Sequence, residues 1–413
     1  MIVTKGEIKM SEVCDLFLNL VKIPSPSLKE DNVSKFILEY CKEHGISARY
    51  DDYKNVRIEV PATDVTKKPL MFSSHMDVVG DSSPVNVVVD GDCYKTDGKR
   101  TLGADDKAGV TLSLYLANEV ANSKNLKHGG LEIIYTRDEE SGMSGIKNAK
   151  LDKISAKHVL VLDGDKLGRL ENAGAGYTLA TLSVKTPYGG HSGIDIHEEH
   201  RLNAAKLIAE LINNLPQGVF YKDETGTVTS INLGTIIAGN IQNNAAKIVE
   251  DNIVSDNYFD FFIDNAMTNV INTNAKAAYS IRSSSLKKEN ELRELMQKIV
   301  DEFNKKYGDL AKAELKFEEH LPMFEKSTDE KIEEVYKKAC EKVGMTPDIG
   351  SFHAGAETHI YANSKNKNGE KFAPFLMGAA DIYNMHSNAE YVNYKTIEKG
   401  YELIKQMFIE FNS

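Results

Sequence analysis

The sequence has no tryptophan, only four cysteines among 413 residues, and no apolar run long enough to cross a membrane. A membrane-spanning helix needs about 18 or more consecutive apolar residues. The N-terminal sequence MIVTKGEIKMSEVCDLF also lacks the apolar segment of a signal peptide. We therefore expect a cytoplasmic protein with no membrane partner.

The cysteines Cys14, Cys41, Cys93 and Cys340 are isolated from one another in the sequence. None has the C-x-x-C spacing of a zinc clip or a redox pair. In a reducing compartment such cysteines typically serve as small core residues, and we expect that role for all four.

Positive charge is also in the minority, because 50 Lys and Arg residues face 61 Asp and Glu residues, which gives a formal net charge of −11. Nucleic-acid binding depends on clustered Lys and Arg side chains that release counterions from the phosphates. The acidic balance therefore argues against a nucleic-acid partner.

The pattern of apolar runs is typical of an α/β protein with a mixed sheet flanked by helices. Runs at 70–73, 131–136, 159–162 and 375–377 alternate with amphipathic stretches. Each run is followed at once by a loop that contains acidic residues or histidine. Because open α/β sheets bind ligands at the carboxyl ends of their strands, these loops are the first candidates for a functional site.

A second pattern begins near Tyr177. An alternating, strand-like run is followed by an amphipathic helix at 201–215, another alternating run that ends near Ser285, a helix at 287–307 and the strand-like sequence AELKF. This order predicts a small α+β unit inserted into the larger sheet.

The length favours about two domains of roughly 150–250 residues each. We predict a catalytic domain at 1–176 and 319–413 and an inserted lid domain at 177–318. The Asn-rich stretch at 240–268 looks like an insertion or a long loop.

Five loops carry the same residue types, imidazole and carboxylate without thiolate. This donor set suits two divalent ions, Zn²⁺ first and Co²⁺ or Mn²⁺ next, better than a structural cysteine site. A single acid after a strand is more typically a turn or helix-cap residue, but five such loops together favour a dinuclear centre. The loops contain His75 with Asp77, Asp105 with Asp106, Glu139 with Glu140, Asp163, and His386.

The sequence AGAG at 173–176 has an alternative interpretation as a nucleotide-binding loop. It lacks the third glycine in register, and Tyr177 begins a strand pattern rather than a helix. The signal for a nucleotide site is therefore weak.

Several motifs occur in a characteristic order and spacing: SSHMDVVG, TLGADDKAGV, YTRDEESG, VLDGD and GGHSG. Together they resemble the co-catalytic zinc exopeptidases of the M20 family, over about residues 11–408. GADDKAG is most similar to the peptidase T branch, which consists of tripeptide aminopeptidases. GGHSGIDIH and HAGAE are more similar to the Xaa-His dipeptidase branch.

The resemblance implies two metal ions and, by matching positions, their ligands. Asp105 rather than Asp106 is the bridge, since the family pattern is Asp, any residue, then Lys; the peptide after this Asp is cis in relatives. The resemblance assigns His75 and Asp163 to one ion, Glu140 and His386 to the other, and Asp105 to both.

The resemblance also implies roles for two neighbouring acids. Asp77 matches the carboxylate that orients the imidazole of His75. Glu139 matches the general base that takes a proton from the attacking water and returns it to the leaving amine. Glu140 cannot share this role, because a metal-bound carboxylate has its lone pairs committed and its pKa depressed.

Three lid positions match the family as well. His191 matches a histidine that stabilises the tetrahedral oxyanion, in several relatives from the partner subunit. Asn269 matches a family asparagine, and Arg282 matches the arginine whose planar fork receives the substrate carboxylate. The resemblance thus implies a homodimer formed through the lid.

Two positions depart from the family pattern. Asn272 stands where the family usually has proline, and the HAGAE motif replaces a Gly-Gly-Thr-Asp-type loop. An aminopeptidase must recognise an α-ammonium, and Glu357 in this motif is a candidate partner for it. An ordinary surface glutamate is the alternative interpretation.

The predicted function is a metallo-exopeptidase that hydrolyses short peptides, most like a tripeptide aminopeptidase. Within hydrolases, the alternatives are a dipeptidase or an N-acyl amino acid amidohydrolase with the same metal centre. Outside enzymes, the alternative is a metal-dependent binding scaffold. A requirement for a free substrate ammonium would separate the aminopeptidase from the amidohydrolase.

Overall fold

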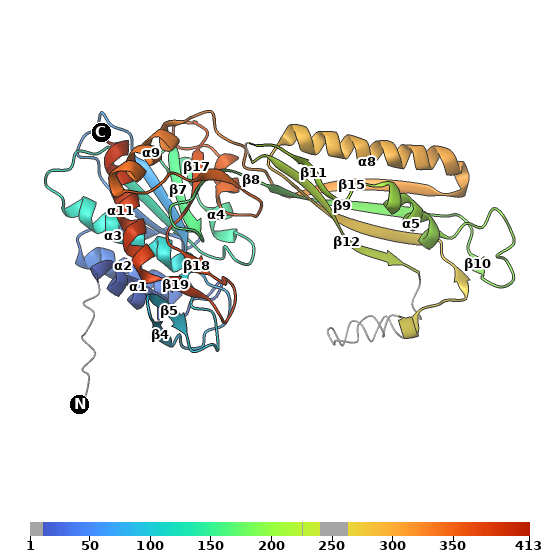
Figure 1. Ribbon diagram of the computed structural model, residues 1–413, viewed down its shortest axis with the longest axis horizontal. Coiled ribbons are helices and arrows are strands. Elements are labelled where there is room, and N and C mark those ends of the chain that lie inside the picture. Colours follow the sequence, from blue (N-terminus) through green and yellow to red (C-terminus); the bar gives the residue numbers. More distant parts are fainter. Residues whose placement is uncertain (1–10, 225, 240–262) are drawn as a thin grey trace. The chain divides into compact units, whose positions relative to one another are not determined.

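The computed structural model describes residues 11–224, 226–239 and 263–413. The chain forms two compact units, one made of Met1–Gly174 with Phe324–Ser413 and the other of Ala175–Met323 (Figure 1). The first unit is thus discontinuous in sequence, and the second is inserted into it. Most of the Asn-rich stretch at 240–268 lies outside the described residues.

An eight-stranded sheet forms the centre of the first unit. In spatial order its strands are β1 (Ser47–Tyr50), β2 (Val56–Val60), β6 (Leu131–Thr136), β3 (Leu70–His75), β7 (His158–Gly164), β17 (Ala373–Gly378), β8 (Leu170–Gly174) and β16 (Ile349–Phe352). The four strands from β6 to β17 are parallel to one another. Their outer neighbours β2 and β8 are antiparallel to them. The predicted mixed α/β sheet is therefore confirmed.

Helices cover both faces of this sheet (Figure 1). Strand β3 illustrates the consequence, since Leu70 and Phe72 belong to one core cluster and Met71 to the other. Successive side chains point to opposite faces, so a strand between two helical layers is apolar throughout. The larger layer contains α1 (Glu12–Val21), α2 (Asp31–Glu43), α3 (Ala104–Asn122), α9 (Lys331–Val343) and α11 (Tyr394–Phe411), and the smaller contains α4 (Ser144–Asn148), η1 (Leu151–Lys153) and α10 (Thr358–Ala362).

Helix α3 approaches the sheet closely at Gly109. A Cβ atom at this position would lie 2.6 Å from Ser74 Oγ on β3 and 2.7 Å from Leu162 Cβ on β7. No larger residue fits without displacing a strand, so this glycine sets the distance between the sheet and the start of α3.

A small four-stranded sheet joins two distant parts of the sequence. Its strands, in spatial order, are β18 (Ile382–Tyr383), β19 (Tyr391–Asn393), β5 (Cys93–Thr96) and β4 (Val87–Asp90). Strand β19 pairs with β5, with Tyr391 opposite Lys95. No pattern in the sequence predicted this sheet. It ties the loop that carries His386 to the segment that leads into α3.

The second unit is a five-stranded antiparallel sheet with two helices packed on it. Its strands, in spatial order, are β11 (Gly218–Lys222), β12 (Val228–Ala238), β14 (Asn274–Ser283), β9 (Gly176–Lys185) and β15 (Lys312–Leu321). Buried residues of β9 and β14 pack against α5 (Ala204–Asn214) and α8 (Leu286–Tyr307). The α+β character predicted for this region is confirmed.

Several smaller predictions can be compared with the structure. Cys14, Cys41 and Cys340 are buried free thiols, as expected, whereas Cys93 is only half-buried. The AGAG sequence lies where β8 ends and β9 begins, not at the start of a helix. In the part of the chain that the structure describes, no helix is both long and apolar enough to span a membrane.

Candidate metal centre and active site

The predicted metal ligands come from five segments that meet at the carboxyl ends of the parallel strands. His75 is the last residue of β3, Asp163 lies near the end of β7, and Glu140 follows β6. Asp105 lies in the first turn of α3, and His386 lies between β18 and β19. Parallel strands present their carboxyl ends at one edge of a sheet, which explains why distant segments converge here.

The two carboxylate oxygens of Asp105 face two different imidazoles. Oδ1 lies 3.2 Å from His75 Nε2, and Oδ2 lies 3.0 Å from His386 Nε2. His75 Nε2 is also 3.3 Å from Asp163 Oδ1, and His386 Nε2 is 3.1 Å from Glu140 Oε2. Two groups of donors therefore share one carboxylate. The peptide bond between Asp105 and Asp106 is cis.

This donor set fits divalent cations. Ligand atoms of His75, Asp105 and Glu140 all lie within 4.8 Å of one another. Oε1 of Glu140 is buried without a hydrogen-bond partner among the described residues. Imidazole and carboxylate donors with a free, buried oxygen are typical of a site for zinc or a similar ion.

Without a cation Glu140 and Asp163 hold protons tightly, whereas hydrogen bonds from His386 and His75 lower the pKa of Asp105. Burial raises the pKa of Glu140 and of Asp163 to about 7, and the Asp105 carboxylate adds to both shifts. The hydrogen bond with Asp105, aided by the charge of Glu140, raises the pKa of His386 to about 9. Burial and neighbouring carboxylates raise the pKa values of the acids, and the same carboxylates raise that of the imidazole because they favour its charged form; divalent cations would compensate this negative charge.

Asp77 connects the metal centre to the loop of the proposed base. His75 Nδ1 lies 2.9 Å from the backbone carbonyl of Asp77 and 3.4 Å from its carboxylate. That buried carboxylate accepts the backbone N–H groups of Glu139 and Glu140 at 2.9 and 3.2 Å, and the hydroxyl of Ser27 at 2.7 Å. The side chain thus lies beside His75 and also holds the neighbouring loop in place.

Glu139 lies with the ligands on the wall of a cavity of about 330 Å³. Burial, and then the charges of Asp163 and Asp105, raise its pKa to about 8. A carboxylate with a raised pKa near a reaction site is suited to proton transfer near neutral pH. Other parts of the cavity wall include Arg169, Glu171, Phe352, Leu376 and Met385.

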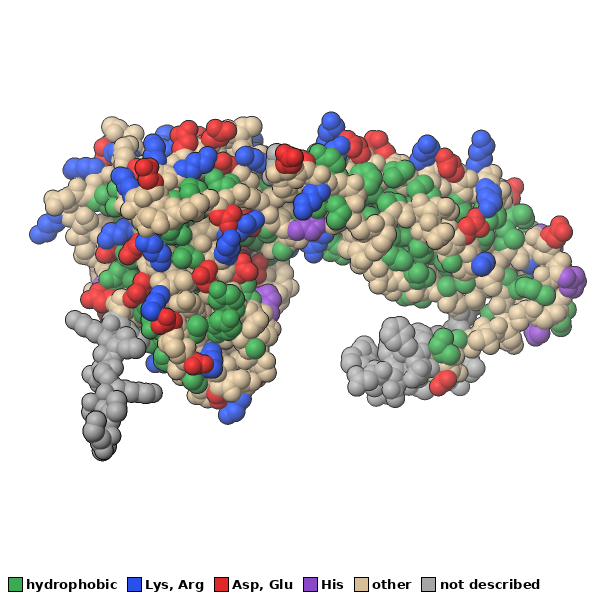
Figure 2. Space-filling view, in the orientation of Figure 1, with side chains coloured by type: hydrophobic (Ala, Val, Ile, Leu, Met, Phe, Trp, Pro, Cys, Tyr) green, Lys and Arg blue, Asp and Glu red, His purple; other side chains and the backbone are tan. Residues whose placement is uncertain are grey.

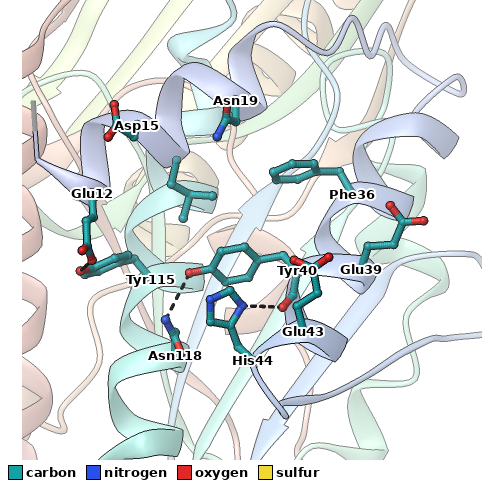
Figure 3. A pocket seen from close by; sticks show the side chains of 11 residues that line it. Glu12, Asp15, Asn19, Phe36, Glu39, Tyr40, Glu43, His44, Tyr115 and Asn118 are labelled. Atoms are coloured by element: carbon teal, nitrogen blue, oxygen red, sulfur yellow. Dashed lines mark hydrogen bonds between the residues drawn. The ribbon is translucent and has the colours of Figure 1, made fainter.

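A second cavity, of about 440 Å³, lies between α1, α2 and α3 (Figure 3). Its wall carries several acids, but its single histidine, His44, stacks on Tyr40 with 4.1 Å between ring centroids. Nδ1 of His44 lies 2.8 Å from the backbone carbonyl of Tyr40. This histidine is held by its own helix, so the first cavity is the better candidate for the active site.

Two residues of the predicted lid domain, from distant parts of the sequence, lie close together in the second unit. His191 in β10 (Gly190–His191) pairs with Val270 in β13 (Val270–Ile271). The N–H of Ser192 donates to the carbonyl of Asn269 at 2.9 Å. Both His191 and Asn269 are exposed.

Arg282 lies elsewhere in the same unit. It pairs with Tyr177 at one end of β14, and its guanidinium lies 4.7 Å from the centre of the Tyr177 ring. Asn274, at the other end of this strand, is eight residues away, or about 26 Å at the usual rise of a strand. The unit therefore brings His191 and Asn269 together but not Arg282.

Glu357 is 1% exposed, so its alternative interpretation as a surface glutamate is wrong. The hydroxyl of Ser73 donates to Oε2 at 3.1 Å, while Oε1 has no partner among the described residues. Burial raises its pKa to about 8. The side chain does not line the 330 Å³ cavity, and its pairing with a substrate ammonium stays a prediction.

Two buried glutamates beside the site were not predicted. Glu30 accepts the N–H of Asp138 at 3.0 Å and the guanidinium of Arg137 at 2.7 Å. It therefore supports the loop that leads to Glu139. Glu390 contacts the loop of Asp105 in a similar way. Only its position four residues after His386 could have drawn attention to it in the sequence.

Comparison with known proteins places these features in a family. The model of peptidase family M20/M25/M40 matches residues 71–410. Peptidase T of Halothermothrix orenii is 24% identical over 96% of this chain and 98% of its own.

Solved structures share the fold over nearly the whole chain. The aminopeptidase PepT of Bacillus cereus has a TM-score of 0.79 at 22% identity, covering 97% of this chain and 98% of its own. A dinuclear metal binding M20 peptidase of Bacillus subtilis has a TM-score of 0.66 at 13% identity and covers 96% of both chains. Since the family model matches most of the sequence, the chain belongs to peptidase family M20/M25/M40.

Proposed function

We propose that this protein is a dinuclear metallo-exopeptidase that releases N-terminal residues from short peptides, tripeptides above all. The observation that carries the proposal is the position of Asp105 between His75 and His386. A carboxylate shared in this way is the central element of a two-metal hydrolase. The similarity to peptidase T of Halothermothrix orenii and to the aminopeptidase PepT of Bacillus cereus supports the choice of an aminopeptidase.

The ligand assignment follows the two groups of contacts. His75 and Asp163 would hold one ion, Glu140 and His386 the other, and Asp105 would hold both. Zn²⁺ suits these donors best, and Co²⁺ or Mn²⁺ are the next candidates. When bound, the ions would supply Lewis-acid activation of a water molecule and of the scissile carbonyl.

Glu139 is the proposed general base. It takes a proton from the attacking water as the new C–O bond forms, and it gives that proton to the amine nitrogen as the C–N bond breaks. Its neighbour Glu140 has an oxygen 3.1 Å from His386 and is committed to the ligand group. Asp77 supports both roles, because it holds the backbone of both glutamates and lies beside His75.

The lid would recognise the remainder of the substrate. Arg282 is proposed to bind the carboxylate of the peptide, for which a planar guanidinium is suited. His191 is proposed to donate to the oxyanion of the tetrahedral intermediate, with Asn269 beside it. Since His191 and Arg282 lie at opposite ends of the lid sheet, one short peptide cannot contact both residues of the same lid.

This separation supports a homodimer in which each active site uses His191 of the partner subunit. The two edges of the lid sheet differ in how readily they could pair with a second copy of the chain. The edge strand β15 carries Lys and Glu side chains, which discourage pairing. On the other side, β11 pairs only with the first part of β12, and Ile236 and Ile237 beyond it are 49% and 66% exposed. Figure 2 shows apolar side chains on the visible face of this unit.

An N-acyl amino acid amidohydrolase or a dipeptidase is the second candidate. The burial of Glu357 favours retaining this second candidate function. Glu357 is the residue predicted to bind the substrate ammonium, and it is absent from the cavity wall. The same metal centre and Arg282 would serve either substrate class. A binding scaffold without catalysis is set aside, since the chain belongs to a peptidase family and contains both the ligand set and Glu139.

The deciding experiment combines metal analysis with a substrate panel. Zinc- or cobalt-loaded protein is incubated with di-, tri- and tetrapeptides and with their N-acetylated forms, and the released amino acids are identified. Release of the N-terminal residue from free tripeptides supports the proposal. Hydrolysis of acylated substrates alone would replace it with the amidohydrolase, and no hydrolysis at all would revive the scaffold.

A further inference from the structure

The carboxylate of Glu390 is buried and accepts hydrogen bonds from the loop that leads to Asp105. It is 1% exposed. Oε2 accepts the N–H of Gly103 at 2.7 Å and the hydroxyl of Thr101. Oε1 accepts the N–H groups of Ala104 and Asp105 at 2.9 and 3.3 Å. Both oxygens are thus used by the segment that ends at the shared carboxylate.

The segment needs this acceptor. The first N–H groups of a helix have no partner within the helix, and the positive end of the helix dipole favours an anion there. In α3 the backbone at Asp105 and Asp106 is not helical, so the beginning of the helix cannot support itself. Glu390 supplies both the hydrogen bonds and the negative charge.

Glu390 is also fixed to the other metal loop. It lies four residues after His386, and its N–H donates to the carbonyl of Ser387 at 3.2 Å. The next residue, Tyr391, begins strand β19 and pairs with Lys95. One side chain therefore joins the loop of Asp105 to the loop of His386, whose ligand atoms are 3.0 Å apart.

We propose that Glu390 is a positioning residue of the metal centre, which sets the affinity of the ion held by Glu140 and His386. The inference rests on the ligand set proposed above. A glutamine has the same shape but presents an NH₂ group where one of the two oxygens now accepts N–H groups. Supporting residues behind metal ligands typically change metal affinity by about 10- to 100-fold.

The test is a metal titration of metal-free protein with Co²⁺ or Zn²⁺ alone, against a competing chelator, so that two binding events are resolved. Glu390→Gln should weaken one event by about 10- to 100-fold relative to the other. Glu333→Gln is the matched control. Glu333 is 8% exposed and accepts from Asn172 at 2.7 Å, away from the ligand loops, so both events should stay unchanged.

A second variant covers the case in which Glu390→Gln does not fold. Thr101→Val keeps the carboxylate and removes one donor, so it should weaken the same event by about 2- to 10-fold. Wild-type affinity for both ions in the folded Glu390 variant, or in Thr101→Val, overturns the inference. Equal weakening of both events does so too. If the wild-type protein binds no ion, the ligand assignment itself has failed, which is a different result.

Discussion

The two units of this protein hold their candidate residues in opposite ways. In the first unit, His75, Asp105 and Glu140 are mostly buried and within a few ångströms of one another. In the second unit, His191 is exposed and Arg282 lies at the far end of the sheet. The first unit thus brings imidazole and carboxylate donors together, as a metal site requires, whereas the second unit presents His191 and Arg282 apart from one another, with His191 on the surface.

Because of this contrast, variants of the first unit can be interpreted within a single chain, whereas a His191 variant must be interpreted in the proposed dimer. Variants of the first unit should act on metal binding and proton transfer in every subunit independently. Variants of the second unit should act on substrate contacts, and in the proposed dimer a His191 variant should act on those of the neighbouring subunit. The following predictions are arranged from the largest expected effect to the smallest.

Replacing Glu139 should remove most of the activity without removing metal. Glu139→Gln keeps the shape of the side chain but cannot accept the proton of the attacking water, so turnover should fall by at least about 10²-fold. Metal content, measured by elemental analysis, should equal that of the wild type. Substantial turnover by the fully loaded variant would contradict the assignment of the base.

His191→Ala should lower turnover by about 10²- to 10³-fold, as expected for the loss of an oxyanion donor. If His191 acts across a dimer, mixing this variant with Glu139→Gln under exchange conditions should restore activity. The mixed dimer would contain one site with an intact base and a histidine from the other subunit. No recovery in verified mixed dimers would place His191 in its own subunit's site or outside catalysis.

Arg282 should affect substrate binding more than turnover. Arg282→Ala removes hydrogen bonds to a charged carboxylate, worth about 1.5–3 kcal/mol, so kcat/KM should fall about 10- to 150-fold. The loss should be smaller for peptides with an amidated C-terminus, which lack that carboxylate. An equal loss for both substrates would show that Arg282 does not bind the carboxylate.

Metal-free protein should lose stability as the pH rises from about 5 to 8. The folded-state pKa values are raised to about 8 for Glu139 and about 7 for Glu140 and Asp163. The folded state therefore binds protons more tightly than the unfolded state, and the stability present below pH 4 is lost as the pH rises through these values. His386, with its pKa raised to about 9, acts in the same direction.

Thermal unfolding across this pH range, with and without added Zn²⁺, checks the prediction. The Tm of the metal-free protein should be lower at pH 8 than at pH 5. The Tm of the loaded protein should change little over this range, because the cations neutralise the acids. A metal-free protein that is more stable at pH 8 than at pH 6 would contradict the proposed crowding of charge.

The sequence was informative about the first unit for a physical reason. Short apolar runs identify strands buried on both faces, and the residues directly after them, such as His75 and Glu140, are placed by the strand ends. Asp105 and His386 do not directly follow a strand of this sheet, and the position of Asp105 between two imidazoles was implied only by the resemblance to the M20 family. For the inserted unit, alternation along β9 and β14 was equally clear, and it predicted the sheet and its helices.

What escaped prediction depends on contacts between distant segments. The sheet formed by β5 and β19 has strands too short for a pattern, and Glu390 is significant only because that sheet brings it to Gly103. The alternative interpretation of Glu357 as a surface glutamate failed for the same reason, because the side chain is buried against Ser73. The spacing of residues in the sequence does not reveal that Glu390 contacts Gly103 or that Glu357 contacts Ser73.

The discontinuity of the first unit has a consequence for synthesis on the ribosome. Strand β17 lies between β7 and β8 in the finished sheet, yet it follows the whole insertion in the sequence. Domains generally fold as units while the chain emerges, so the inserted unit can fold before the sheet around it is complete. His386 comes later still, and a nascent chain therefore passes through most of its translation without a competent hydrolytic centre.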